Sequence, residues 1–99
     1  MSLLLSLTTE ARHDITVLTV EGLERFGEHV ADSYVDEMFT LFDRLAAFPD
    51  IGTVRRLDPE VRIVPYRSHV VLYERRRGEV LILRVRHGRE DWLRELQED

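Results

Sequence analysis

The sequence predicts an α+β fold in which a helical hairpin packs on a mainly antiparallel sheet, in the order β-α-α-β-β-β. Two observations support this prediction. Apolar residues recur every three or four positions over residues 9–48, which is typical of helices, and every second position from residue 53 onward, which is typical of strands. The 99 residues suffice for one core, so we expect a single domain over residues 1–99.

A short strand and a helix are expected first. The apolar run "SLLLSL" at residues 2–7 predicts a strand, and Thr8 or Thr9 can cap a helix that follows over residues 9–26. The segment "DITVLTV" is rich in β-branched residues and favours a strand locally, against the helical spacing around it. The face of this helix toward the core would carry Ala11, Ile15, Leu18 and Gly22.

A second, more clearly amphipathic helix follows Gly27, so the two helices should fold back as a hairpin. Pro49 cannot continue the second helix, and Gly52 supplies the turn after it. Its apolar face is expected to contain Ala31, Tyr34, Val35, Met38, Phe42, Leu45 and Phe48.

Three strands are predicted in the second half, at residues 61–66, 69–75 and 79–87. A tight turn at residues 76–78 makes the last two antiparallel neighbours. Pro65 has no amide donor, so its strand should have a bulge or an edge there. The tail "EDWLRELQED" is compatible with one or two helical turns.

Strict alternation along the last strand predicts two faces with different chemistry. One face would carry Val80, Ile82, Arg84 and Arg86, and the other Leu81, Leu83, Val85 and His87. The arginines of the first face have two interpretations. They pair with acidic residues of the helices inside one molecule, or they bind acidic side chains of a partner.

Composition excludes several kinds of chemistry. There is no cysteine, and all 14 basic residues are arginine, so thiolate and lysine chemistry are absent. The four histidines show no zinc-ligand spacing, and we expect neither a metal nor a cofactor. The start of the chain is too short for a secretion signal or a membrane span, so we expect a cytoplasmic protein that does not bind membranes.

The net charge of −5 is divided unevenly along the chain. Residues 1–50 hold three arginines and ten acids, which gives −7, whereas residues 55–89 hold ten arginines and four acids, which gives +6. This division indicates two faces with different partners. It argues against direct sequence-specific binding of nucleic acid, for which a basic domain is expected.

Four segments together resemble one known family. They are "LSLTTEARHDI", "ADSYVDEMFTLFDRLAAFPDIG", "TVRRLDPEVRIVPYRSHVVLYE" and "VLILRVRHGREDW", the last with Arg84, Val85, His87, Arg89 and Asp91 in an Arg-Val-x-His-x-Arg-x-Asp pattern. In order and spacing they resemble the RelE/ParE superfamily of type II toxins, and the ParE branch more than the RelE branch. The resemblance runs from about Leu5 to Asp91.

The resemblance implies a toxin that inhibits DNA gyrase, is not an enzyme, and is neutralised in a hetero-oligomer with a ParD-like antitoxin. Arg84 and Arg86, together with Arg55 and Arg62, would bind acidic side chains of the antitoxin. Trp92 would either pack on the sheet or face gyrase, and Phe39 and Leu41 could extend a groove for an antitoxin helix. The alternative is a RelE-like, ribosome-dependent and metal-independent mRNA endoribonuclease. Its site would combine His87 with the phosphate-binding Arg62, Arg67 and Arg84. A third reading is a homologue that has lost toxicity and persists as a binding module. His87 also has a structural interpretation, as a ring that closes the end of the sheet.

Overall fold

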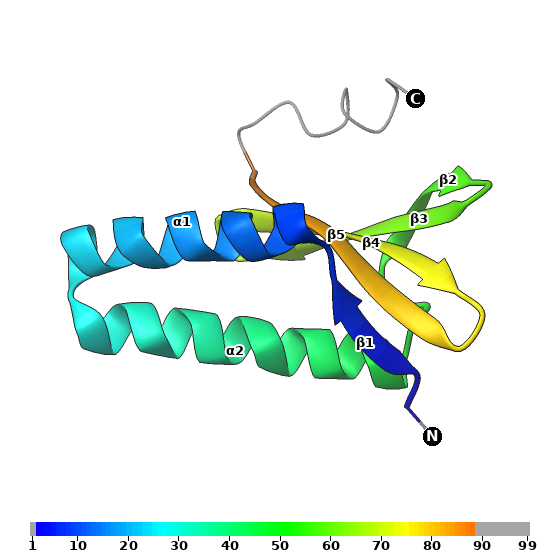
Figure 1. Ribbon diagram of the computed structural model, residues 1–99, viewed down its shortest axis with the longest axis horizontal. Helices are drawn as coiled ribbons and strands as arrows, with labels where there is room; N and C mark the ends of the chain where they lie inside the picture. The colour runs from blue at the N-terminus through cyan, green and yellow to red at the C-terminus, as the bar shows by residue number, and fades with distance from the viewer. Residues whose placement is uncertain (1, 89–99) are drawn as a thin grey trace.

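The computed structural model describes residues 2–88 and confirms the predicted α+β fold (Figure 1). A helical hairpin follows a first strand and precedes the rest of the sheet. The elements are β1 (Leu4–Leu7), α1 (Thr9–Phe26), α2 (Glu28–Ala47), β2 (Thr53–Leu57), β3 (Glu60–Tyr66), β4 (His69–Arg76) and β5 (Glu79–His87). The predicted helical turns of the tail and Trp92 lie outside the described residues.

The sheet contains five strands in the order β1-β5-β4-β3-β2, with β1 parallel to β5 and the other pairs antiparallel. The strand β2 was not predicted. Its sequence "TVRRL" holds two apolar residues three positions apart, and the pairing with β3 shifts register between Val54 and Arg56. An irregular edge strand of this kind lacks the alternation by which strands are recognised.

Helix α1 begins and ends at the predicted residues. The side chain of Thr8 accepts a hydrogen bond from the Ala11 amide at 3.0 Å, and Gly27, at φ 85°, separates the helices. The β-branched segment "DITVLTV" stays helical because Ile15 and Leu18 pack on the core. Neither described helix is long and apolar enough to cross a membrane.

The main core lies between the hairpin and one face of the sheet. Helix α2 contributes Met38, Phe42 and Leu45, all fully buried. They belong to one cluster with Ala11 and the sheet residues Val64, Val71, Tyr73, Val80, Ile82 and Val85. The prediction for Phe48 was wrong. This residue ends α2 with φ −134°, outside the helical region, and is 64% exposed.

A bulge in β5 changes the predicted faces of that strand. Tyr73 pairs with Ile82 and Leu72 with Arg84, so Leu83 is an extra residue. Val80, Ile82 and Val85 therefore face the helices together, while Leu83 packs with Leu72 on the second face of the sheet. Arg86 pairs with Val70 of that second cluster, so it does not share a face with Val80 and Ile82.

Pro65 lies at a local edge, although β3 is an inner strand. The pairing between β2 and β3 extends only to Ile63, and Pro65 is paired on one side alone, with Val70 of β4. The missing amide of Pro65 therefore costs no ladder hydrogen bond toward β2.

Candidate functional site

Helix α1 covers the part of the β5 edge that β1 leaves unpaired. Strand β1 pairs with β5 only as far as Ile82. Beyond that point the Thr8 hydroxyl donates to the carbonyl of Leu83 at 2.7 Å, and the Asp14 carboxylate accepts from the Val85 amide at 3.0 Å. Side chains of α1 and its cap thus satisfy backbone groups that a further strand would otherwise pair.

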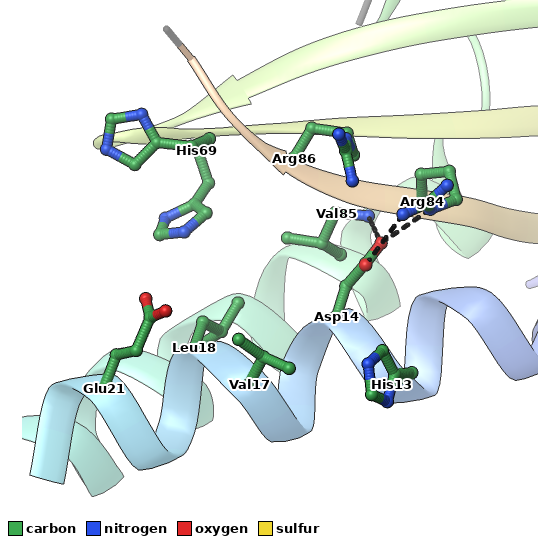
Figure 2. Close-up of a pocket in the computed structure, with 10 residues that line it drawn as sticks. His13, Asp14, Val17, Leu18, Glu21, His69, Arg84, Val85 and Arg86 are labelled. Carbon is green, nitrogen blue, oxygen red and sulfur yellow. Dashed lines mark hydrogen bonds and ion pairs between the residues drawn. The ribbon is translucent and has the colours of Figure 1, made fainter. Parts of the chain in front are cut away.

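Arg84 is held by the same carboxylate. Its guanidinium donates to both oxygens of Asp14, at 2.8 and 3.0 Å, in a two-point ion pair (Figure 2). The Asp14 side chain is only 10% exposed and that of Arg84 31%. The pair therefore lies in the wall between α1 and β5, which agrees with the interpretation that this arginine pairs with a helix acid inside the molecule.

A cavity of about 330 Å³, called here the polar pocket, opens beside this ion pair. Helix α1 forms one wall and the end of β5 the other. Figure 2 shows Glu21, Leu18 and Val17 on the helix side, opposite His69 and Arg86. The pocket is lined by His13, Asp14, Val17, Leu18, Glu21, His69, Arg84, Val85, Arg86 and His87.

Two histidines from neighbouring strands line the polar pocket. His69 of β4 and His87 of β5 are cross-strand partners, with ring centroids 5.4 Å apart. The Tyr34 hydroxyl of α2 lies 2.6 Å from Nδ1 of His69. Burial raises the pKa of Tyr34, more than the hydrogen bond from the Ser68 backbone and the charge of Arg67 lower it. Tyr34 is therefore a neutral hydroxyl at neutral pH.

A second cavity of about 190 Å³, the apolar pocket, continues from the first toward the end of the helical hairpin. Its apolar walls include Phe26, 64% exposed, and Val30, 49% exposed. The two pockets share Leu18, Glu21, His69 and His87, and together they form one groove with a charged end and an apolar end. The remaining lining of the apolar pocket is Gly22, Arg25, Ala31, Tyr34 and Ser68.

The residues proposed for ribonuclease chemistry are distributed over different places. Arg84 and His87 line the polar pocket. Arg62 instead donates to Glu60 at 2.7 Å and to the carbonyl of Gly52 at 2.7 Å, and the hydrogen bond to Glu60 raises its pKa further. Arg67 pairs with Glu37, away from the pocket lining. The four predicted residues do not converge on one position where a phosphate could sit.

Of the residues predicted to bind a partner, only Arg84 and Arg86 lie together in the groove. Arg55 is exposed on β2, at the opposite edge of the sheet, and Arg62 holds the loop before β2. Trp92 lies outside the described residues. Phe39 lines a separate small cavity with Leu7, Arg12 and Ile15.

The other half of the groove was not predicted from the sequence. Tyr34 was expected on the apolar face of the second helix, and the predicted site residues include neither His69, Phe26 nor Glu21. One signal was present: His69 and His87 flank the two strands of one predicted hairpin, so a pairing of these residues could have been considered. No described group of histidine and carboxylate residues has the arrangement of a metal site.

The comparisons with known proteins decide the family. The family described as the ParE toxin of the type II toxin–antitoxin system parDE matches residues 5–92, which is most of the chain. The chain belongs to the ParE toxin family. The residues of the groove all fall inside the matched range of this ParE-family protein.

A solved structure agrees with this assignment at the level of the fold. The ParE-family chain is similar to a chain of the chromosomal ParDE toxin–antitoxin system from P. aeruginosa, with a TM-score of 0.74 and 19% sequence identity. The alignment covers 87% of this chain and 96% of that one. A search of the curated proteins finds no significant match.

Proposed function

We propose that this ParE-family toxin inhibits DNA gyrase in the cytoplasm without being an enzyme, and that a cognate ParD-like antitoxin neutralises it in a hetero-oligomer. The observation that carries the proposal is the family match over residues 5–92. It is supported by the resemblance of the last strand to ParE toxins and by the fold shared with a chain of a ParDE system.

The groove is the surface that we propose for the antitoxin. Its two ends suit a segment that carries a carboxylate at one end and a large apolar side chain at the other. Arg86 lies at the charged end, and Phe26 and Val30 remain about half exposed or more at the apolar end. Exposed apolar residues along a groove are typical of surfaces that a partner covers.

The candidate catalytic residues lie in different parts of the molecule, which also supports a toxin that binds its target protein and does not cleave RNA. General acid–base cleavage of RNA requires the base, the acid and the phosphate-binding cations within hydrogen-bond reach of one reacting group. Arg62 and Arg67 are each engaged with carboxylates away from the polar pocket. A site built from His87 would have to operate without these two residues.

The decisive experiment compares the two targets with one preparation of the toxin. Purified gyrase, ATP and supercoiled plasmid are incubated with the chain, and ribosome-dependent cleavage of mRNA is measured in parallel. We expect linear DNA to accumulate after denaturation of the complex, while the message stays intact. Cleaved message with unchanged plasmid would reject gyrase as the target and favour the ribonuclease.

The proposed partner is tested by co-expression. The open reading frame next to the toxin gene is expressed with the tagged chain, and the complex is isolated by size exclusion. We expect a stable hetero-oligomer that no longer acts on gyrase. A toxin that elutes alone and stays active in the presence of this gene product would contradict the proposal.

A further inference from the structure

The second face of the sheet, which points away from the helices, is apolar. Alternation along β3 and β4 decides which residues it carries, since Val64, Val71 and Tyr73 belong to the core on the helix side. The second face therefore holds Val61 and Ile63 of β3 and Val70, Leu72 and Glu74 of β4, with the bulged Leu83 of β5 packed beside them. In an antiparallel sheet, a face that water covers is normally polar. This composition indicates a face that is covered.

The residues of the second face are also shielded from water. Val61 is 0% exposed and Leu72 is 2% exposed, and Glu74, which accepts from Arg76 at 2.6 Å, is buried beside them. Neighbouring side chains alone do not exclude water so fully from the middle of an open sheet. Neither helix contributes to this cluster, which within residues 2–88 contains sheet residues alone. The cover therefore comes from outside the described helices and strands.

The chain leaves the sheet beside this face. Gly88 follows β5, and its amide donates to the Ser68 carbonyl at 2.8 Å. A Cβ atom at Gly88 would lie 4.0 Å from the Cγ2 atom of Val70, so the backbone passes next to the apolar cluster. Residues 89–99 follow. Even at the short rise of about 1.5 Å per residue this length reaches about 16 Å, whereas three strands span about 10 Å.

Residues 89–99 have a composition that fits the second face. Trp92, Leu93 and Leu96 are their apolar residues, and together these three side chains can cover a cluster of similar size. The other positions are polar or charged, with five acids and two arginines, which gives −3. A segment of this kind can bury one side against the sheet and leave the other in water.

The charge at the rim of the second face distinguishes between possible covers. Arg56 is the cross-strand partner of Val61, and Arg86 is that of Val70, so both arginines flank the cluster. A second copy of this face would bring arginines toward arginines, whereas an acidic segment has the opposite charge. Both arginines already interact within the molecule, which is compatible with a cover that belongs to the same chain.

We propose that residues 89–99 bind the second face of their own sheet, with Trp92 against the cluster of Ile63, Val70 and Leu72. A segment joined directly to the sheet meets this face at an effective concentration on the order of millimolar, which favours it over a separate partner. The inference decides between the two interpretations of Trp92, because a ring packed on the sheet does not face gyrase. It concerns the free toxin and does not rest on the proposed function.

The fluorescence of the chain reports on this contact directly, because Trp92 is its only tryptophan. Emission and quenching by acrylamide are measured on the free, full-length toxin in buffer and in urea. We expect the native protein to emit at a shorter wavelength and to be quenched less than the unfolded protein. In NMR spectra, the indole protons of Trp92 should show NOEs to methyl groups of Val70 and Leu72.

Two leucine substitutions, one on each side of the sheet, separate this contact from general stability. Leu83→Ser removes an apolar side chain of the second face, whereas Leu41 is also partly buried but packs on the helix-side core. Leu83→Ser should shift the native emission of Trp92 to longer wavelength and increase quenching. Leu41→Ser is the matched control and should leave both unchanged. Thermal unfolding followed by circular dichroism checks that each variant folds, and the NOEs of the natural chain decide if one does not.

Native emission and quenching equal to those in urea would overturn the inference, and so would an indole ring without NOEs to the second face. Equal changes in Leu83→Ser and Leu41→Ser would also reject it, since the emission would then report a general loosening of the core. Emission that moves to longer wavelength on dilution would show that a second copy supplies the cover, which contradicts binding within one chain. The gyrase assay has no part in these measurements, so its outcome leaves them unchanged.

Discussion

The carboxylate of Asp14 binds three groups of one strand: two guanidinium nitrogens of Arg84, at 2.8 and 3.0 Å, and the backbone amide of Val85 at 3.0 Å. These hydrogen bonds join residues that are 70 and 71 positions apart in the sequence. The ion pair therefore fixes the position of α1 against β5 and, with it, the wall of the groove. Arg84 therefore helps to position the α1 wall of the groove through its ion pair with Asp14.

The substitution Asp14→Asn should lower the stability of the protein. An amide keeps one acceptor oxygen but loses the charge, and it cannot accept from all three donors. We expect a loss of about 2–3 kcal/mol in the free energy of unfolding, the range for a half-buried charge-assisted contact. Urea denaturation measures it. Asp36→Asn, at an exposed position of α2, should cost less than about 0.5 kcal/mol, and equal losses at both positions would contradict the role of Asp14.

The same substitution at two helix glycines should have opposite effects. A methyl group at Gly22 would meet Cβ of Ala31 at 3.4 Å, an ordinary contact, so Gly22→Ala should stabilise α1 by about 0.5–1 kcal/mol. Gly27 has φ 85°, which other residues rarely adopt, so Gly27→Ala should destabilise by about 1 kcal/mol. Melting temperatures that shift in the same direction would refute this pair of predictions.

The fold could be predicted from the sequence because the patterns that indicate it most clearly lie within short segments of the chain. Residues 28–47 repeat the helical period without interruption, Gly27 separates the helices, and Gly78, with φ 77°, marks the last hairpin. The core residues Met38, Phe42 and Leu45 follow from that period alone. None of these inferences requires knowledge of which strands are neighbours.

The residues of the groove could not be predicted from local patterns, because a single extra residue in β5 determines which side chains line it. With the turn at Arg77 and Gly78, an unbroken ladder would place Arg86 opposite His69. The bulge at Leu83 shifts the register by one position and places His87 there instead. A one-residue shift also exchanges the faces of the strand beyond it. Nothing in the local pattern of "LILRVRH" marks the bulge, since aliphatic and polar residues are compatible with either register.

The hydroxyl of Tyr73 should contribute more to the free energy of unfolding than the hydroxyl of Tyr66. Tyr73 is fully buried; it donates to the Pro49 carbonyl at 2.7 Å and accepts from the Gly52 amide at 2.8 Å. Tyr73→Phe would leave both backbone groups without this partner, and we expect a loss of about 2 kcal/mol. Tyr66→Phe removes one bond, to the carbonyl of Tyr34, and should cost about 1 kcal/mol. Chemical denaturation of both variants ranks them.

Buried tyrosines also predict the response of the protein to alkali. Burial raises the pKa of Tyr73 above its usual value of about 10, and it does the same for Tyr34 and Tyr66. A pKa that is higher in the folded state gives stability that is complete below about pH 10 and is lost as the pH rises through the folded value. The urea midpoint should therefore fall above about pH 10 and less steeply in Tyr73→Phe. An equally steep fall in that variant would exclude Tyr73 as a cause.

The exposed apolar end of the groove gives a test that separates binding from folding. Phe26 is 64% exposed and lines the apolar pocket, so Phe26→Ser should change the free energy of unfolding by less than about 1 kcal/mol. If an antitoxin side chain covers Phe26, the same variant should bind the antitoxin at least about tenfold more weakly, as expected for a central aromatic contact. Leu57→Ser is the matched control, because Leu57 is 81% exposed at the end of β2, on the other edge of the sheet. Calorimetric titration of both variants with the antitoxin should show a loss of affinity for Phe26→Ser alone. If both variants bind more weakly, or only Leu57→Ser does, the antitoxin does not bind in the groove.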